Sequence, residues 1–350
     1  MGETALHAHL AARAAVHADE RGMLLPQRFG EDVTAEYRAL RAGAAIVDLG
    51  FRTVLRAVGA DRAAFLQGML TNDVARLRPG EGCAALLLTI QGRVTADVRV
   101  SADPEALLLD VDVRVRSDFL AALEKLLIAD EVELVPPAEP TALLGLEGRH
   151  ASAVLPTVPG DQIGAHLMTQ VAGVPVRVVR ASEVRGPGYA LHVPAASAVT
   201  VWDALVAAGS QPCGMQALEA RRVEVGVPRI GLDMDGSTLA LEVPVEDAMS
   251  ATKGCYLGQE VVARGTARGH VNRKLVGLQL FGGTPPPPGA NLIRDGKESG
   301  RLTSVARFLG GEGYIALGFV RRECWDAGTE LSVRHGHAVT IARVTPFPLA

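Results

Sequence analysis

Lys253-Gly254-Cys255-Tyr256-Leu257-Gly258-Gln259-Glu260 is the stretch of this chain that says most about its fold and its chemistry. It places a thiol close to a lysine, between two glycines and directly ahead of an expected helix over 259–264. A nearby cation and a helix N-terminus each favour the thiolate form of a cysteine. Gly254 leaves room for a ligand or another backbone beside the thiol. The alternative is a loop cysteine that only packs, because free cysteines are often buried and inert.

The same eight residues resemble the K-G-C-[FY]-x-G-Q-E signature of the YgfZ-like proteins, which are folate-binding relatives of the glycine-cleavage T-protein. The similarity continues on both sides of the motif. Residues 214–228, GMQALEARRVEVGVP, are similar to the family's x-A-x-E-x-x-R-x-E-x-G-x-P stretch. Thr71-Asn72-Asp73-Val74 and Gly318-Phe319-Val320-Arg321 are similar to its N- and C-terminal markers. The resemblance therefore runs from about residue 30 to the C-terminus, and the cysteine motif is its most specific part.

The resemblance implies a T-protein-like α+β fold of three domains in a cloverleaf. Two interleaved α+β domains would form a folate cleft, and a C-terminal β-barrel would complete the ring. The corresponding ranges are 1–140 for an N-terminal α+β folate-binding region, 141–272 for a second α+β region with the cysteine motif, and 273–350 for the barrel.

The resemblance also implies a function. It predicts a folate-binding accessory protein of iron–sulfur cluster assembly or repair, a role associated with tRNA modification, with Cys255 as the reactive residue. The cofactor would be tetrahydrofolate or a derivative, and the partners would be iron–sulfur proteins or assembly factors. One alternative is a tetrahydrofolate-dependent aminomethyltransferase of the T-protein type. Another is a scaffold that retains only the fold.

Asp97 lies in an expected strand over 94–100, where a period of two places Val94, Ala96 and Val98 on one face and Asp97 on the other. A solvated strand face is the simple interpretation of the polar side. In the T-protein relatives, an aspartate of a G-x-x-x-D-D pattern is catalytic and lies by the reactive nitrogens of tetrahydrofolate. The resemblance therefore implies that Asp97 is catalytic and folate-binding, although Ala96 replaces the first carboxylate of the pair.

Further ligand-binding candidates lie on the expected helix over 215–225 and in the cysteine motif. Arg221 and Glu224 are three residues apart and can form a helix-surface ion pair. Arg222 matches the family's R-x-E-x-G pattern and could bind the carboxylates of a folate tail. The resemblance extends the folate-binding set to Glu224, Lys253 and Tyr256.

One departure from the relatives weakens the aminomethyltransferase alternative. The relatives hold the pterin ring with a glutamate in a G-x-E segment, whereas the corresponding stretch here, Gly188-Tyr189-Ala190-Leu191, has alanine. Pterin recognition is therefore expected to differ or to be weaker.

Composition points to a cytoplasmic protein of two or three domains. The chain has 350 residues, 48% of them hydrophobic, and no run of 18 apolar residues, so no membrane-spanning helix is expected. The net charge of −4 argues against a broad nucleic-acid footprint. Four scattered cysteines without a C-x-x-C pair suit free thiols in a reducing compartment, not a disulfide framework or a zinc site.

Two local clusters have simple interpretations. His335 and His337 alternate on an expected strand, but without a third ligand they do not predict a metal site. The basic run over 264–274 is typical of a solvated linker. Because it follows Cys255, it could also bind a folate tail, an acidic partner or RNA.

Periodicity and turn residues predict the elements of the first half of the chain. Residues 1–25 are expected to form an Ala-rich helix, and Asp61 and Ser117 are expected to cap helices. Gly92 is expected in the turn of a hairpin. The remaining expectations are a helix from 34 ended by Gly43, and strands over 44–49, 53–58, 83–88, 94–100 and 107–111.

The second half alternates strands and helices before a region of short strands. Helices are expected over 150–155, 196–208 and 215–225, and strands over 142–146, 174–179 and 189–193. Strands over 274–280, 300–306, 315–320, 330–334 and 339–344 predict a small barrel or sandwich. The glycines at 310, 311 and 313 are expected to form a loop.

Overall fold

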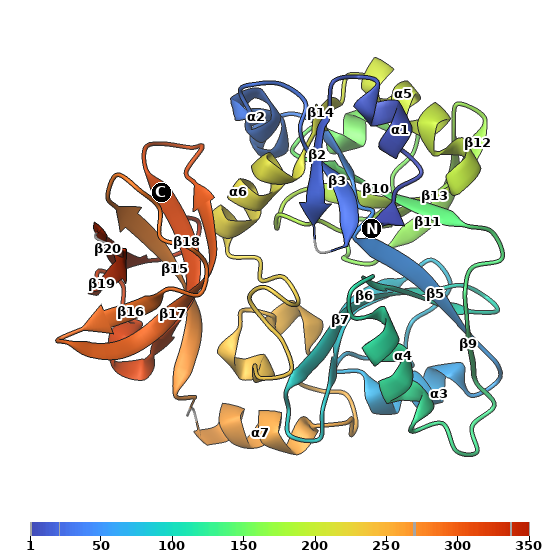
Figure 1. Cartoon of the computed structure of the whole chain (residues 1–350). Helices are drawn as coiled ribbons and strands as arrows, with labels where there is room; N and C mark the ends of the chain where they lie inside the picture. The colour runs from blue at the N-terminus through green and yellow to red at the C-terminus, as the bar shows by residue number, and fades with distance from the viewer. Residues whose placement is uncertain (1, 21, 269–270, 337, 350) are drawn as a thin grey trace.

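The fold was analysed in a computed structural model, which describes residues 2–20, 22–268, 271–336 and 338–349. Figure 1 shows three lobes around a central segment that leads into α7. Two of the lobes are α+β layers and the third is a β-barrel, as the sequence predicted.

A six-stranded sheet with the order β11-β12-β13-β10-β4-β14 forms one lobe. β10 pairs antiparallel with β13 on one side and with β4 on the other, so an early strand lies beside later ones. This pairing interleaves the two α+β units. The bounds are β4 Ala45–Asp48, β10 Thr141–Glu147, β11 His166–Val171, β12 Val174–Arg180, β13 Gly188–Pro194 and β14 Gln211–Cys213.

Helices α2 (Thr34–Ala42), α5 (Ala198–Ala207) and α6 (Met215–Val225) accompany this sheet. Trp202 of α5 is buried against Ile46 of β4 and the strands beside it. Gly226 ends α6 in a left-handed conformation with φ 76°, which glycine adopts without strain. The predicted helix stops at Gly43 and Gly226 are confirmed.

A five-stranded sheet with the order β6-β7-β8-β5-β9 forms the second lobe. Valine and alanine side chains of β7 point into its core, and the alternating polar positions are half-buried, so the predicted period of two is confirmed. Helices α3 (Arg62–Met69) and α4 (Arg116–Glu124) belong to this lobe. The bounds are β5 Arg52–Val58, β6 Gly82–Leu88, β7 Val94–Ala102, β8 Leu107–Asp112 and β9 Glu133–Val135.

The C-terminal lobe is a closed barrel with the order β15-β18-β17-β16-β19-β20. The five expected strands are present, and the sequence missed the sixth, β16, because it is only four residues long. Leu292 of β16 is nevertheless fully buried in the barrel core. The bounds are β15 Arg273–Phe281, β16 Asn291–Arg294, β17 Lys297–Arg307, β18 Tyr314–Arg321, β19 Glu330–His335 and β20 Ala338–Thr345.

The expected helix over residues 1–25 was wrong. The segment instead holds β1 (Gly2–Glu3), the short helix α1 (His7–Ala11), β2 (Val16–Glu20) and β3 (Met23–Arg28). Ala14 has a positive φ of 60°, which ends the helical path, and β2 pairs antiparallel with β3. Burial of Leu6, Leu10 and Leu25 against the sheet outweighs the helix propensity of alanine.

Two predicted helix caps also differ from the structure. Asp61 stands at the N-cap position of α3, but its carboxylate accepts a hydrogen bond from the backbone N–H of Glu131 at 2.8 Å. Ser117 lies inside α4, which begins at Arg116. A side chain with a long-range partner is no longer available to cap its own helix.

Candidate functional site

Asp97 lies on β7, where the five-stranded sheet faces the loop that follows β12. Its Oδ2 accepts a hydrogen bond from Arg52 Nη1 at 3.0 Å, and its Oδ1 is buried without a hydrogen-bond partner among the described residues. Arg52 is itself buried and donates from Nε to Asp110 Oδ1 at 2.6 Å. One oxygen of the Asp97 carboxylate is therefore bound to the Arg52 guanidinium, and the other is an acceptor without a donor among the described residues.

Arg99 lies two residues further along β7, on the same face as Asp97. Its guanidinium donates to Glu183 in the loop after β12, and Nη1 lies 3.5 Å from Asp110 Oδ2. Burial opposes ionisation of Glu183, but Arg99, Arg52 and Arg229 outweigh it and lower the pKa of Glu183 to about 2. Glu183 is thus an ionised carboxylate surrounded by the guanidinium groups of three arginines.

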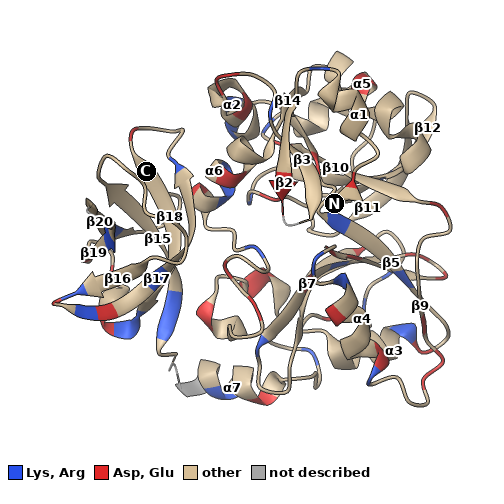
Figure 2. Cartoon of the chain, in the orientation of Figure 1, with Lys and Arg blue, Asp and Glu red and all other residues tan. Residues whose placement is uncertain are grey.

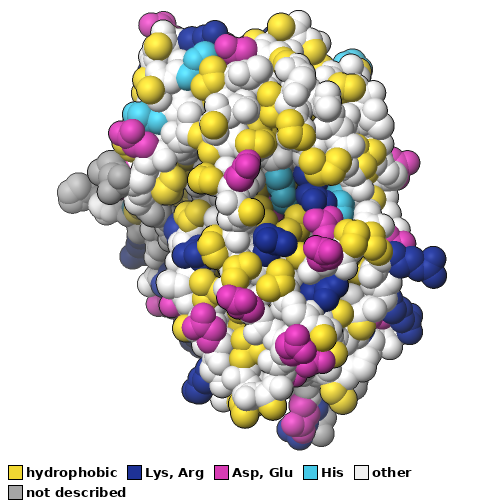
Figure 3. Space-filling model, turned by 90° about the vertical axis from the view of Figure 1, so that its right-hand side faces the viewer, with side chains coloured by type: hydrophobic (Ala, Val, Ile, Leu, Met, Phe, Trp, Pro, Cys, Tyr) yellow, Lys and Arg dark blue, Asp and Glu magenta, His cyan; other side chains and the backbone are white. Residues whose placement is uncertain are grey.

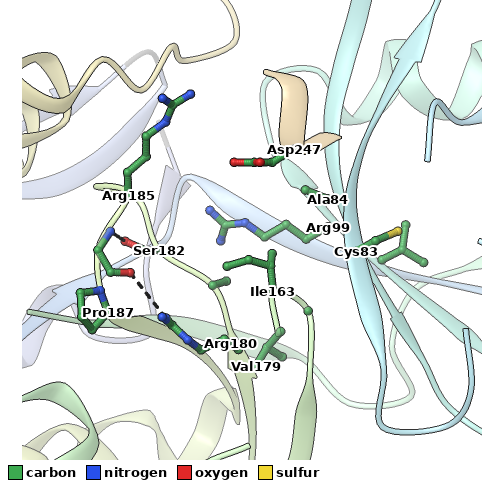
Figure 4. A pocket seen from close by; sticks show the side chains of 14 residues that line it. Cys83, Ala84, Arg99, Ile163, Val179, Arg180, Ser182, Arg185, Pro187 and Asp247 are labelled. Carbon is green, nitrogen blue, oxygen red and sulfur yellow. Dashed lines mark hydrogen bonds between the residues drawn. The ribbon is translucent and has the colours of Figure 1, made fainter. Parts of the chain in front are cut away.

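Two cavities adjoin this charged cluster, and they share Arg99 and Ser182 in their walls. The larger has a volume of about 510 Å³ and lies between β6 and β7 on one side and the end of β12 with its following loop on the other. Figure 4 shows Cys83, Ala84 and Asp247 on one side of this space and Ser182, Arg185 and Pro187 on the other, with the side chain of Arg99 between them and Ile163 beside Arg180. The smaller, of about 60 Å³, contains Asp97 and Glu183 in its walls.

Arg229 also lines the smaller cavity, and sequence reasoning missed it. Its guanidinium lies over the ring of Phe51 at 4.8 Å, and Nη1 donates to Glu219 at 3.2 Å. Nη2 is buried without a hydrogen-bond partner among the described residues. Burial lowers the pKa of Arg229, although Glu219 acts in the opposite direction. The one signal in the sequence was its position directly after the Gly226-Val227-Pro228 helix stop.

Arg222, the arginine favoured by the sequence pattern, is fully occupied by the protein. Its five N–H groups go to Glu219 twice, to the carbonyl of Val227 at 2.9 Å, to Asp233 at 2.7 Å and to Ser304 at 2.7 Å. A guanidinium has only five donors, so this arrangement leaves none for the carboxylate of a ligand. Arg222 instead joins α6 to β17 of the barrel.

Glu224 lies on the opposite side of α6 from Arg222 and is buried. It accepts a hydrogen bond from Tyr37 of α2 at 2.6 Å and pairs with Arg221 at 2.8 Å, so the predicted i, i+3 ion pair is present, although it is buried and not on the helix surface. These contacts join α2 and α6. Glu224 does not line the two cavities described above.

Lys253 is buried, and its ammonium group meets the C-terminal end of α3. Nζ donates to the backbone carbonyls of Gln67, Leu70 and Asn72 at 2.6, 2.5 and 2.9 Å. Burial lowers the pKa of Lys253 to about 8, whereas Asp73 and Cys83 favour the charged form. The lysine thereby attaches the cysteine motif to the five-stranded lobe.

Cys255 is exposed, whereas the thiols of Cys213 and Cys324 are buried and that of Cys83 is half-buried. The expected helix after the motif is present as α7 (Gln259–Arg268) and begins four residues after the cysteine. A Cβ on Gly254 would meet nothing within 4 Å, so this face of the thiol loop is open. Tyr256 lies against the core formed with β6 and β7, and its ring is 5.1 Å from Lys253 Nζ.

The described residues contain no group of three or more His, Cys, Asp or Glu side chains able to hold a metal ion. His335 contacts Thr340 Oγ1 at 3.1 Å, and His337 lies outside the described residues. Within the same described ranges, no helix is long and apolar enough to cross a membrane.

Three basic residues of the run over 264–274 have separate partners. Arg264 pairs with Glu260 on α7, Arg273 pairs with Glu242 at 3.0 Å, and Lys274 lies 4.7 Å from the ring of Trp325. Residues 269 and 270 lie outside the described part. Figure 2 shows acidic and basic segments interspersed through all three lobes.

Comparison with family models identifies both parts of the chain. Residues 6–253 match the GCVT N-terminal domain, and residues 273–350 match the glycine cleavage T-protein C-terminal barrel domain. The chain belongs to the glycine cleavage T-protein family. The second match begins at Arg273, the first residue of the barrel.

Curated relatives span most of the chain. An aminomethyltransferase of Thermus thermophilus is 30% identical over 348 residues, covering 98% of this chain and 96% of the relative. A putative chloroplastic transferase of Arabidopsis thaliana is 29% identical over 297 residues, covering 83% of this chain and 68% of the relative. The crystal structure of glycine cleavage system aminomethyltransferase T from Bartonella henselae has a TM-score of 0.89 at 21% identity, covering 100% of this chain and 98% of that one. This structural likeness shows the shared T-protein fold.

Within this T-protein fold, Ala190 lies in the middle of β13 and is buried with Val179 and Ala181. Its strand neighbours are Gly145 and Val179, so the alanine belongs to the sheet core beside the larger cavity. A methyl group at this position offers no hydrogen bond to a ligand. Asp97 and Arg229, by contrast, present unpaired polar atoms.

Proposed function

We propose that this protein binds a reduced folate in the two adjoining cavities and acts as an accessory protein in iron–sulfur cluster assembly or repair. The volume of about 510 Å³ lies within the range of small-molecule pockets. Ile163 and Val179 provide apolar walls for a flat ring system, and the guanidinium groups of Arg99, Arg180 and Arg185 lie around it. Donor-rich walls suit a ligand with carbonyl and carboxylate groups.

The observation that carries folate binding is the pair of unpartnered atoms in the smaller cavity. Asp97 Oδ1 is a buried acceptor without a donor, and Arg229 Nη2 is a buried donor without an acceptor, and both residues line the same 60 Å³ space. A buried polar atom left unpaired costs about 1–3 kcal/mol, so an occupant that pairs with it is stabilised. The N–H groups and ring nitrogens of a reduced folate offer both kinds of partner.

Calorimetric titration with 5-formyltetrahydrofolate tests this proposal. We expect wild-type protein to bind it and Asp97→Asn to bind it about tenfold more weakly, because the charged acceptor is lost while the shape is kept. Asp326→Asn, an exposed carboxylate of the barrel lobe, is the matched control and should bind as the wild type does. Equal affinity and equal pH dependence for wild type and Asp97→Asn would assign Asp97 to a structural role.

The iron–sulfur role rests on Cys255. Its exposure and open surroundings suit a thiol that exchanges ligands with a partner, and the resemblance of its motif to the YgfZ-like proteins supports the same role. We place the protein in the cytoplasm, where a reducing environment keeps such thiols free. Its partners would be iron–sulfur proteins or their assembly factors.

A complementation experiment tests that role separately from folate binding. Cells lacking the protein should show low activity of [4Fe–4S] enzymes, restored by wild type but not by Cys255→Ser. Thr252→Ala, an exposed neighbour in the same loop, should restore activity fully. Restoration by Cys255→Ser to the wild-type level would remove the thiol from the mechanism, whatever the folate titrations show.

Aminomethyl transfer is the second candidate, because Asp97 is retained in the cavity wall. We expect negligible transfer, since Ala96 and Ala190 stand where the relatives have carboxylates, and a misplacement of about 1 Å can cost ~10²-fold in rate. A single-turnover assay with tetrahydrofolate and an aminomethylated lipoyl carrier decides between the accessory protein and the aminomethyltransferase. Rapid formation of methylenetetrahydrofolate, abolished by Asp97→Asn, would establish the transferase instead.

A further inference from the structure

A third cavity, of about 450 Å³, lies on another face of the molecule, at the seam between the two α+β lobes. Its walls come from β5 and β8 of one sheet, from β10, β11, β12 and β13 of the other, and from the connection over 137–139. Figure 3 shows the face at the right of Figure 1, on which histidine, arginine and carboxylate side chains gather near the middle among hydrophobic ones. None of the residues considered for folate binding lines this cavity.

His192 of β13 is the buried polar group of this cavity. The residue is only 9% exposed, and no hydrogen bond of its ring is found within the described residues. Burial lowers the pKa of His192 to about 4. The nearby positive groups Arg177, His166 and Arg99 lower this pKa further, whereas the carboxylate of Asp110 raises it. The ring is therefore neutral at physiological pH and presents one donor and one acceptor.

Arg56 of β5 supplies a charge to the same cavity. Its side chain is half-buried, and its guanidinium has no ion pair or hydrogen bond within the described residues. The other arginine, Arg177 of β12, is occupied, because it forms two hydrogen bonds to Asp103 at 2.8 and 2.7 Å. Arg56 is thus the cation left for a ligand, with exposed Glu139 as the acidic residue in the wall.

The remaining walls are apolar. Val54, Leu108 and Val193 are at least nine-tenths buried and line the space together with three prolines and Met168. We propose that this seam cavity binds a small organic acid whose carboxylate pairs with the free guanidinium of Arg56 and whose flat apolar body, with a polar substituent facing His192, lies against these walls. A guanidinium matches a planar carboxylate with two parallel hydrogen bonds, and a few placed polar groups in an apolar pocket set ligand orientation.

Calorimetric and ligand-observed NMR titrations of the full chain with 4-hydroxybenzoate test the proposal. We expect saturable binding at one site, weakened about tenfold in Arg56→Gln, because a charge-assisted pair is lost. Arg301→Gln, an exposed arginine of the barrel, is the matched control and should bind as the wild type does. His192→Leu should weaken binding of 4-hydroxybenzoate more than of benzoate, which lacks the hydroxyl.

Three results would overturn it. They are the absence of saturable 4-hydroxybenzoate binding to wild type, equal binding by Arg56→Gln, and inorganic phosphate binding as tightly as 4-hydroxybenzoate, which would mean that charge alone is recognised. Because the guanidinium of Arg56 has no ion pair or hydrogen bond within the described residues, Arg56→Gln removes no such contact and keeps the test valid even if His192→Leu is unstable.

Discussion

Arg99 on β7 and Glu183 in the loop after β12 form an ion pair that joins the two α+β sheets between the adjoining cavities. Each residue comes from a different lobe, so the pair links β7 to the loop that borders the larger cavity. Arg99 lines both cavities. The ion pair therefore links the two lobes at the boundary of both cavities.

Replacing Glu183 with glutamine should destabilise the protein by about 3 kcal/mol at pH 7. The pKa of Glu183 is lowered from 4.5 to about 2, so its stabilisation is fully present above pH ~4.5 and is lost as the pH falls through about 2. Urea unfolding at several pH values should show the difference between variant and wild type shrinking from pH 5 to pH 2. A difference that does not depend on pH would contradict an ionised Glu183.

Glu147 should give the stability of the protein the opposite dependence on pH. Burial raises the pKa of this carboxyl to about 8, despite hydrogen bonds from Ser182 Oγ at 2.6 Å and the Glu183 backbone N–H at 2.7 Å. Between pH ~4.5 and 8 the folded state keeps a proton that the unfolded state has lost, so stability falls with rising pH by up to about 1.4 kcal/mol per unit. Glu147→Gln should remove this slope in urea unfolding, and an unchanged slope would exclude Glu147 as its source.

Arg222→Met should cost about 3–5 kcal/mol of stability, because it leaves the fully buried Asp233 without its cation and leaves Glu219 with Arg229 alone. Arg264→Met is the matched control, since its exposed ion pair with Glu260 is worth under about 0.5 kcal/mol. Denaturant midpoints and 5-formyltetrahydrofolate affinity should be measured on both variants. If Arg222→Met kept the wild-type stability but lost affinity for 5-formyltetrahydrofolate, Arg222 would be a ligand-binding residue.

Cys255 should be the first thiol alkylated in the native protein. It is exposed, whereas Cys213 and Cys324 are buried and burial raises the pKa of Cys83 to about 12. Iodoacetamide treatment at pH 7.5 followed by peptide mass spectrometry should find Cys255 modified before the others. Cys255→Ser should leave the free energy of unfolding within about 0.5 kcal/mol of wild type, as expected at an exposed position. If Cys83 were alkylated before Cys255, the larger cavity, which Cys83 lines, would be open to the reagent.

The sequence by itself determined the fold class, the strand alternation around Asp97, the helix stops at Gly43 and Gly226, and the relation to the glycine cleavage T-protein. These features are local, because residue period and glycine conformation act within a few positions of the chain. The alanine-rich composition of residues 1–25 predicted a helix, and this was wrong. Buried leucines and strand pairing outweigh the helix propensity of alanine there.

Only the tertiary structure decided which charged side chains have spare hydrogen-bonding groups. Arg222 matched a family pattern, yet its five donors are taken by residues that include Ser304, 82 positions away. Arg229 and Asp97 keep unpaired atoms because the walls that bury them come from both sheets and from the segment after α6. Partners of this kind are set by long-range packing, which a pattern of neighbouring residues does not encode.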